Sequence, residues 1–258
     1  MKKISIEESR KLLPYLRKEK EFNIFIIGDI ENAPDDADYI DVYIDGDLFH
    51  PGGILLRYFD YFIIYTHNKM NYEQAAKIIK DYGKSKVLSG KETCINEIKP
   101  FIEDMIEEEN RMYFTVLKKL QFKHYDYKIK KLTVENAYKV TNLLDNIDEF
   151  NARDNESFVS GIKNGSARSY YMEIDGEIVS TASTSAEAGD SAMIVAVATD
   201  RKYRNKGYAT AVMSKLCSDL VKEGKTPFLF YSNPFAGKIY ERIGFRNIGI
   251  WKMLRFNN

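Results

Sequence analysis

The chain has 258 residues, of which 44% are hydrophobic and 29% are charged, a balance typical of soluble globular proteins with a sizeable core. Its 38 Lys and Arg residues match its 38 Asp and Glu residues, and the lack of net charge disfavours a generally basic nucleic-acid-binding protein. No apolar run approaches the roughly 20 residues that span a bilayer, and Cys94 and Cys217 lie too far apart for a metal motif, so we expect a protein of the reducing cytoplasm.

Helix and strand signals alternate along the first half of the chain. The pattern predicts a helix over residues 7–20, with Pro14 near its start or at a kink. Further expected elements are strands over 41–44, 53–59 and 61–66, a helix over 72–82, a strand over 86–89, a helix over 91–101 and a strand over 111–120. The acidic segment 102–110 is interpreted as a solvated helix face, since no histidine accompanies it to form a metal site.

A second series of elements follows a lysine-rich stretch, and the domain boundary is placed within residues 122–127. The expected elements are a strand over 128–132, helices over 135–146 and 156–164, strands over 167–174, 177–186 and 192–199, a helix from 208, a strand over 226–231, a helix from 234 and a strand over 247–256. Within this series, Asp175-Gly176 is a hairpin signal that requires positive φ.

Two short sequence echoes relate the two halves. Ile129–Asn136 resembles Ile4–Glu8, and Ile174–Glu177 resembles Ile44–Asp47 at nearly the same sequence offset. Matching offsets suggest two copies of one fold. The expected domains are residues 1–124 and residues 125–258.

The most informative segment joins a buried strand to a helix through a basic turn. Ala192–Thr199 is continuously small and apolar, as expected when both faces of a strand are buried. The following helix begins at Tyr208 and is expected to end at Gly224. In the turn, Arg204–Ala209, the free N–H groups of the first helical turn and the glycine suit a pyrophosphate group.

The pattern Arg204-x-x-Gly207-x-Ala209 after such a strand resembles the acetyl-CoA signature of the GCN5-related N-acetyltransferases (GNAT). Downstream, Phe228–Pro234 resembles the family's next strand with its Asn-containing divergence point, and Ala236–Phe245 resembles the closing helix with its Tyr-x-x-x-Gly-Phe ending. The glycine motifs of nucleotide-binding folds are absent. The resemblance implies an α/β (α+β) fold with a mixed sheet and acetyl-CoA (coenzyme A) as cofactor. With the echoes, it implies two tandem GNAT-like domains, of which the first is degenerate and has lost its cofactor turn.

The resemblance also assigns roles to single residues. It implies that Tyr240 protonates the departing thiolate, which a phenol with a pKa of about 10 can do, although Tyr240 could instead simply pack in the core. Asn233 either binds the pantetheine arm or caps the next helix. The implied cofactor-binding residues are Val197, Ala198, Thr199, Arg204, Asn205, Lys206, Gly207, Tyr208, Ala209, Thr210, Asn233, Lys238 and Tyr240.

The general base is less clearly indicated, because the signature strand lacks the glutamate that many family members carry there. Glu187 in the preceding hairpin is the first candidate and Glu149 the second, while a water chain or an already neutral amine stays open. His50, His67 and His124 are interpreted as isolated polar residues.

The expected function is transfer of an acetyl group from acetyl-CoA to a primary amine of a small molecule, amino acid or peptide, by direct attack in a ternary complex. We expect a cytoplasmic monomer or homodimer that binds neither nucleic acid nor membrane. In the acceptor region, Asp148, Glu149 and Glu187 suit a cationic amine, whereas Arg153 and Arg168 suit a carboxylate. A non-catalytic acyl-CoA-binding regulator is the alternative. Transfer from aminoacyl-tRNA is disfavoured by the balanced charge.

Overall fold

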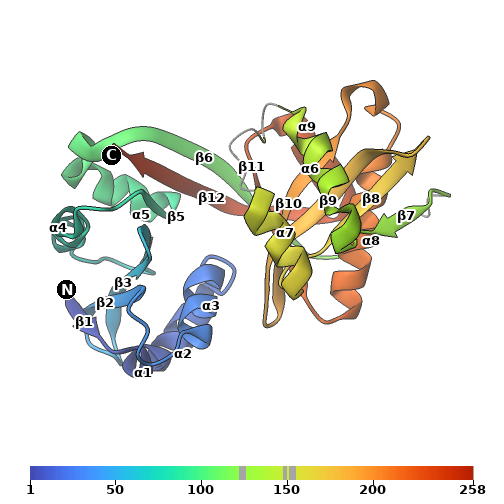
Figure 1. Cartoon of the computed structure of the whole chain (residues 1–258). Helices are drawn as coiled ribbons and strands as arrows, with labels where there is room; N and C mark the ends of the chain where they lie inside the picture. The colour runs from blue at the N-terminus through green and yellow to red at the C-terminus, as the bar shows by residue number, and fades with distance from the viewer. Residues whose placement is uncertain (122–125, 148–149, 151–154, 258) are drawn as a thin grey trace. The chain divides into compact units, whose positions relative to one another are not determined.

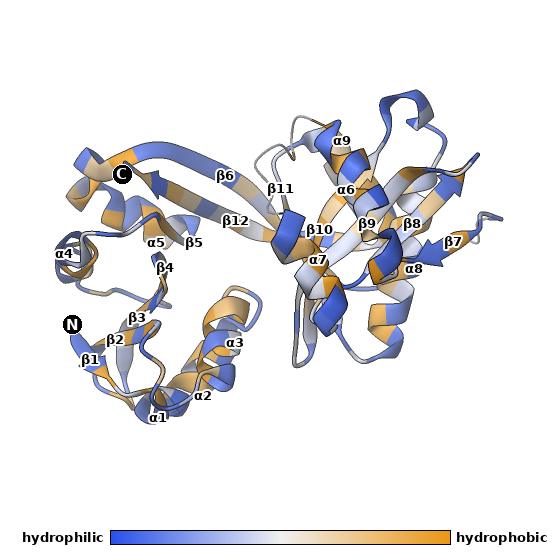
Figure 2. Cartoon of the chain, in the orientation of Figure 1, coloured by the Kyte–Doolittle hydropathy of each residue, from blue (hydrophilic) through white to orange (hydrophobic). Residues whose placement is uncertain are grey.

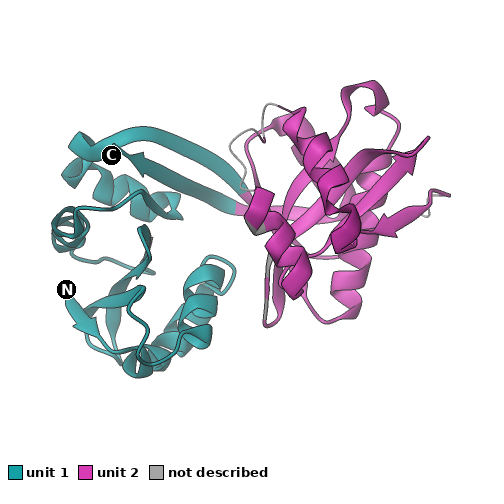
Figure 3. Ribbon diagram, viewed as in Figure 1, with its two compact units in different colours: residues 1–113, 249–258 teal, residues 114–248 magenta. Residues whose placement is uncertain are grey.

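The computed structural model describes residues 1–121, 126–147, 150 and 155–257, and these residues form a mixed α/β fold. The chain divides into two compact units (Figure 3). Unit 1 comprises residues 1–113 and 249–258, and unit 2 comprises residues 114–248. Two long strands, β6 (Ile106–Leu117) and β12 (Phe245–Phe256), contribute residues to both units.

Unit 1 contains a mixed sheet with the strand order β1-β2-β3-β4-β5-β12 (Figure 1). Its other strands are β1 (Lys2–Ile4), β2 (Ile40–Gly46), β3 (Pro51–Tyr58), β4 (Tyr61–Tyr65) and β5 (Val87–Lys91). β4 and β5 pair in parallel, and the other neighbours pair antiparallel. The α-helices are α1 (Ile6–Ser9), α2 (Leu13–Leu16), α3 (Ile24–Asn32), α4 (Tyr72–Tyr82) and α5 (Glu92–Ile98).

Helix α4 joins the parallel strands β4 and β5, and its sequence explains both of its ends. The side chain of Asn71 caps the first turn by accepting a hydrogen bond from the N–H of Gln74 at 2.9 Å. Gly83 ends the helix in the left-handed conformation, with a φ of 69°. Buried residues of α4 share a core cluster with β3, β4, β5 and α5.

One prediction for unit 1 was confirmed in part and another was wrong. Residues 6–19 are helical, as expected over 7–20, but they alternate between α and 3-10 helix, with Pro14 in the first turn of α2, because proline lacks the N–H that a helix interior requires. The acidic segment is not a helix face. After a 3-10 turn at Glu103–Met105, Glu107, Glu108 and Glu109 lie on β6 with exposed side chains.

Unit 2 contains the strand order β12-β6-β11-β10-β9-β8-β7. Its own strands are β7 (Ile129–Lys131), β8 (Ser169–Ile174), β9 (Glu177–Ala188), β10 (Ser191–Thr199) and β11 (Thr226–Tyr231). β10 and β11 pair in parallel, whereas β7 to β10 pair antiparallel. The α-helices are α6 (Ala137–Asp145), α7 (Asn155–Asn164), α8 (Tyr208–Lys222) and α9 (Pro234–Ile243).

Helices cover both faces of the sheet in unit 2. Adjacent strand residues point to opposite faces, and Tyr170 of β8 belongs to a core cluster with α8 and α9, whereas Tyr171 belongs to one with α6. Figure 2 shows hydrophobic and hydrophilic residues along the same helices, as expected when one side of a helix packs on a sheet. In the β8–β9 hairpin, Asp175 and Gly176 have φ of 50° and 84°, which confirms the predicted turn conformation.

The closing strands give a topology that differs from the expected one. Sequence order placed the strand over 247–256 in the second domain, but Trp251–Arg255 of β12 pair with β5 in unit 1. Conversely, the end of β6 lies beside β11, where the Thr115 hydroxyl donates to the carbonyl of Leu229 at 3.2 Å. The compact units therefore differ from the expected division at residues 124 and 125.

Candidate active site

The end of β10 departs from one neighbouring strand and bulges against the other. In the described residues, Ser191–Met193 of β10 pair with Thr226–Phe228 of β11, and the pairing ends there. The pairing with β9 shifts register between Val195 and Ala198. Within this bulge Ala196 has a φ of 51°, in the left-handed region that alanine rarely adopts. Among the described residues, the β11-facing edge of β10 beyond Met193 therefore has no strand partner.

The bulge also changes which β10 side chains face which helices. Ala192 and Ile194 belong to the core cluster with α8, whereas Ala196 and Ala198 belong to the cluster with α6. In a regular strand, all four side chains would point to the same face. The extra residue thus re-aims the backbone groups midway along β10, beside its unpaired edge.

The turn after β10 enters α8 through left-handed residues. Asn205 has a φ of 64° and Gly207, the N-cap of α8, has a φ of 83°. Glycine carries no side chain to cap the helix, so the first-turn N–H groups of Tyr208, Ala209 and Thr210 lack an acceptor within α8. These N–H groups and the helix dipole make the turn a place where an anion is stabilised.

Basic side chains flank this turn. The Nε of Arg204 donates a hydrogen bond to the carbonyl of Thr199 at 3.1 Å. The Nζ of Lys206 lies 5.1 Å from the ring centroid of Tyr203. Both basic side chains are exposed, so their charged ends can meet an anion that arrives from solvent.

Helix α9 begins where β11 ends. Pro234 is in its first turn, and Asn233 Oδ1 accepts a hydrogen bond from the N–H of Phe235 at 2.9 Å. The sequence left two roles open for Asn233, binding the pantetheine arm or capping α9, and the structure shows that it caps α9. In the described part of the chain, the amino group of the same carboxamide has no hydrogen-bond partner. Lys238 lies on the exposed side of α9, with its Nζ 5.6 Å from the ring centroid of Phe235.

Tyr240 is a buried residue of α9. It is 7% exposed, and its ring makes edge contacts with Tyr231 at 5.4 Å and Phe245 at 6.1 Å between centroids. Burial, with a smaller contribution from Tyr231, raises the pKa of Tyr240 to about 12. Its hydroxyl makes no hydrogen bond within the described residues, and its core cluster also includes Ile194 and Val197 of β10. A protonated phenol thus belongs to the same core cluster as residues of β10 that lie beyond its pairing with β11.

The family model for GNAT acetyltransferases matches residues 42–254. The chain belongs to the GNAT acetyltransferase family. No curated protein sequence matches the chain.

Solved structures of GNAT proteins share the fold. A GCN5-related N-acetyltransferase from Kribbella flavida aligns with a TM-score of 0.64 at 12% identity, over 93% of this chain and 95% of that chain. A GCN5-related N-acetyltransferase-like protein from Streptococcus suis aligns with a TM-score of 0.56 at 16% identity, over 95% and 100%. A tandem GNAT protein from the clavulanic acid biosynthesis pathway aligns with a TM-score of 0.58 at 12% identity, over 98% and 96%. At these identities the likeness shows the fold alone.

In this GNAT protein, Glu187 lies on β9, away from the bulge of β10. It is the cross-strand partner of Ala192, where β10 and β11 still pair. The distance from Ala192 to Ala196 along an extended strand is about 13 Å. Glu149, the second candidate for the general base, lies outside the described residues.

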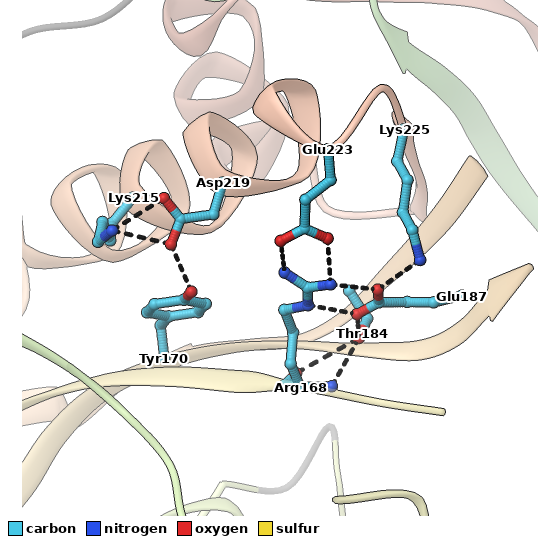
Figure 4. A network of polar contacts seen from close by, with 8 residues as sticks. All are labelled: Arg168, Tyr170, Thr184, Glu187, Lys215, Asp219, Glu223 and Lys225. Carbon is cyan, nitrogen blue, oxygen red and sulfur yellow. Dashed lines mark hydrogen bonds and ion pairs between the residues drawn. The ribbon is translucent and has the colours of Figure 1, made fainter. Parts of the chain in front are cut away.

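The contacts of Glu187 also argue against proton transfer. Both of its oxygens accept hydrogen bonds of 2.7 Å from Arg168, which also donates to Glu223 at 2.6 Å (Figure 4). Lys225 and Thr184 donate to the same carboxylate at 2.9 Å and 2.8 Å. Burial alone would raise the pKa of Glu187, but these hydrogen bonds outweigh it and lower the pKa. A carboxylate with a low pKa and this many donors is a poor proton acceptor.

A chain of buried hydroxyls near the bulge has no counterpart among the sequence predictions. Ser183 donates to Ser169 at 2.8 Å, Ser169 lies 3.1 Å from the Thr181 hydroxyl, and Thr181 donates to the carbonyl of Tyr170 at 3.1 Å. Ser183 is paired with Val195, where the bulge begins. The sequence feature that could have indicated these linked hydroxyls is the run of serines and threonines in β9, a strand that would otherwise be apolar.

The remaining candidates from the sequence lie elsewhere. His50 lies 3.6 Å from Asp47 and His67 lies 3.5 Å from Glu19, all in unit 1, whereas His124, Asp148 and Arg153 lie outside the described residues. Among the residues with a described position, no group of three or more His, Cys, Asp or Glu could hold a metal ion. None of the helices in that part of the chain is long and apolar enough to cross a membrane.

Proposed function

We propose that this protein is an acyl-CoA-dependent N-acetyltransferase that moves an acetyl group from acetyl-CoA to a primary amine of a small molecule, amino acid or peptide. The observation that carries the proposal is that β10 stops pairing with β11 after Met193. The rest of β10 then leads to the turn with Gly207 at the start of α8. The free strand edge suits an extended amide-containing arm, and the turn suits the phosphates at the end of that arm. Membership of the family supports the same activity.

The cofactor residues divide into two groups in this proposal. Around Gly207, the N–H groups of Ala209 and Thr210 and the side chains of Arg204 and Lys206 hold the pyrophosphate. Along the strand, backbone groups of Val197, Ala198 and Thr199 pair with the pantetheine arm, and the free amino group of Asn233 donates to one of its carbonyls. Asn205, Tyr208 and Lys238 complete the site as its lining.

When bound, the thioester of acetyl-CoA would supply an acyl group whose carbonyl carbon an amine can attack. A backbone N–H beside the bulge at Ala196 stabilises the negative charge that develops on the carbonyl oxygen. The amine nitrogen forms a bond to the carbonyl carbon and loses a proton to water, and the bond between carbon and sulfur breaks. Tyr240 then gives its proton to the departing thiolate and recovers one from solvent.

The amine is proposed to attack in its neutral form, since β10 carries no carboxylate near the bulge. Glu187 has no role in this proposed mechanism, because it lies away from the bulge and its oxygens accept hydrogen bonds from Arg168. Arg168 and Glu187 bind each other, so neither selects an acceptor by its charge. This leaves a small-molecule or peptide amine as the proposed partner.

Unit 1 is proposed to be a degenerate copy of the same fold. Its order β2-β3-β4-α4-β5 repeats the order β8-β9-β10-α8-β11, with a parallel last pair in both cases. However, β4 and β5 pair from Tyr61 through Ile64, and the first turn of α4 is capped by Asn71. A capped helix start offers no N–H cradle, so unit 1 is proposed to hold no cofactor.

The test combines cofactor binding with turnover. Purified protein is heated with and without CoA, and release of free thiol from acetyl-CoA is followed with polyamines, amino acids, aminoglycosides and short peptides. Stabilisation by CoA together with amine-dependent thiol release supports the proposal. Absence of CoA binding to the folded protein overturns it.

The second candidate is a non-catalytic acyl-CoA-binding regulator. The observation that favours it is the absence of a free carboxylate on β10 and the engagement of Glu187 in ion pairs. The two functions differ in the same assay, because a regulator is stabilised by CoA but releases no thiol with any amine.

A further inference from the structure

The cofactor turn contains two residues in the left-handed region. Asn205 and Gly207, separated by one residue, both have positive φ. Asparagine tolerates the left-handed region better than most residues, but the conformation remains unfavourable for any residue with a Cβ atom. Such a turn persists when surrounding contacts fix it.

Tyr127 supplies contacts on both sides of Gly207. Its hydroxyl donates a hydrogen bond to the carbonyl of Lys206 at 3.1 Å. Its ring meets the ring of Tyr208, the first residue of α8, edge to face at 5.2 Å between centroids. Lys206 and Tyr208 are the two chain neighbours of Gly207. The side chain of Tyr127, which lies 79 residues before Lys206, therefore contacts the residues on both sides of Gly207.

The backbone that precedes Tyr127 is itself anchored in unit 2. The N–H of Lys118 donates to the carbonyl of Gly244 at 3.3 Å, and the N–H of Gln121 donates to the carbonyl of Ile243 at 2.8 Å. After Tyr127 the chain enters β7, which pairs with β8. Described segments on both sides of Tyr127 are therefore hydrogen-bonded to the body of the unit.

From these contacts we propose that Tyr127 is a positioning residue for the cofactor turn, which keeps the N–H groups after Gly207 aimed at the pyrophosphate of acyl-CoA. The proposal rests on the proposed function, because it takes acyl-CoA as the ligand of the turn. Tyr127 acts through the carbonyl of Lys206 and touches neither the acyl group nor the amine. Its effect is confined to the affinity for the cofactor.

The test is Tyr127→Phe, which removes the hydroxyl and keeps the ring against Tyr208. The Kd of CoA and the KM of acetyl-CoA are expected to rise about 3- to 10-fold, the factor that one net hydrogen bond contributes. The kcat at saturating acetyl-CoA and the KM of the amine are expected to stay within about twofold of wild type. Tyr138→Phe, at an exposed tyrosine of α6, is the matched control and is expected to change none of these values.

A second variant tests the route of the effect. Gly207→Ala places a Cβ on the left-handed residue and disturbs the turn directly. If Tyr127 acts through this turn, the loss of CoA affinity in the double variant is smaller than the product of the two single losses. A strictly multiplicative loss contradicts the proposal.

The outcomes separate the two levels of the hypothesis. If the wild-type protein does not bind CoA, the proposed function fails and the role of Tyr127 fails with it. If the wild-type protein binds CoA and Tyr127→Phe binds equally well, the role of Tyr127 alone is overturned. Equal changes in kcat, in both KM values and in the melting temperature of the free protein also overturn it, because they indicate general packing.

Discussion

Gly237 lies directly against the ring of Tyr231, so that a Cβ at position 237 would lie 2.7 Å from a ring carbon and 2.8 Å from the hydroxyl oxygen. Glycine in a helix costs stability relative to alanine, and here its lack of a side chain allows α9 to approach the end of β11. Since Tyr231 also contacts Tyr240, this close approach sets the position of the proposed acid.

The first prediction concerns this contact. Gly237→Ala forces the Tyr231 ring aside, and the cost of overpacking exceeds the gain in helix propensity by about 1 kcal/mol. We expect this loss in urea unfolding and a lower kcat, because Tyr240 is displaced with the ring. Glu241→Ala, on the exposed side of the same helix, serves as the control. A Gly237→Ala variant as stable and active as wild type would show that the contact is dispensable.

The second prediction concerns Tyr240 as an acid. Tyr240→Phe should lower kcat about 100-fold or more, the typical contribution of a general acid, and leave the Kd of CoA within about twofold. Since burial raises the pKa of Tyr240 to about 12, the wild-type rate should rise as the amine deprotonates and should not fall again up to pH 10. Equal losses in kcat and CoA affinity would assign Tyr240 a packing role.

The third prediction concerns the charge at the cofactor turn. Arg204→Ala should weaken CoA binding about 10-fold, because it removes a charge-assisted contact to phosphate. Raising the salt concentration should weaken wild-type binding and narrow the difference between the two proteins. Lys222→Ala removes a positive charge from the far end of the same helix and is the control. If Arg204→Ala and Lys222→Ala weaken CoA binding equally, the net charge of the protein and not the position of Arg204 at the turn accounts for the affinity.

The fourth prediction concerns the ion pairs of Glu187. Glu187→Gln removes the charged partner of Lys225 and one of the two carboxylates that bind Arg168, and we expect a loss of about 2 kcal/mol in urea unfolding at pH 7. The turnover of the folded variant should remain within a few-fold of wild type. A loss of kcat above about 100-fold in a folded variant would restore Glu187 as the general base.

The same carboxylate makes part of the stability depend on pH. The folded state lowers the pKa of Glu187 below its ordinary value of 4.5, so protonation favours the unfolded state. The stabilisation is complete above the unfolded-state pKa and disappears as the pH falls through the lower folded-state pKa. The stability difference between wild type and Glu187→Gln should therefore shrink between about pH 5 and pH 3. A constant difference over this range would contradict the contribution of this carboxylate.

The sequence predicted the parts of the site that depend on neighbouring residues. The strand over 192–199, the helix start at Tyr208 and the turn at Asp175-Gly176 follow from local hydrophobicity, capping and the conformational preference of glycine. The bulge at Ala196 gave no local signal, because a bulge is a relationship between two strands.

Contacts over long sequence distances were likewise missed. Glu187 appeared to be a free carboxylate near the signature strand, and its ion pairs with Arg168 and Lys225 depend on how β8, β9 and the end of α8 meet. The hydrogen bond from Tyr127 to Lys206 joins residues 79 positions apart, and no local pattern indicates such a contact, since one tyrosine among 18 carries little information.

The pairing of β12 with β5 has a consequence for synthesis of the chain on the ribosome. Unit 1 gains its last strand from Trp251–Arg255, which follow the whole of unit 2 in the sequence. Until they emerge, the edge of β5 that receives them has exposed N–H and C=O groups, as any sheet edge does. Although nearly all of unit 1 is translated before unit 2, its sheet is completed only after unit 2 has been translated.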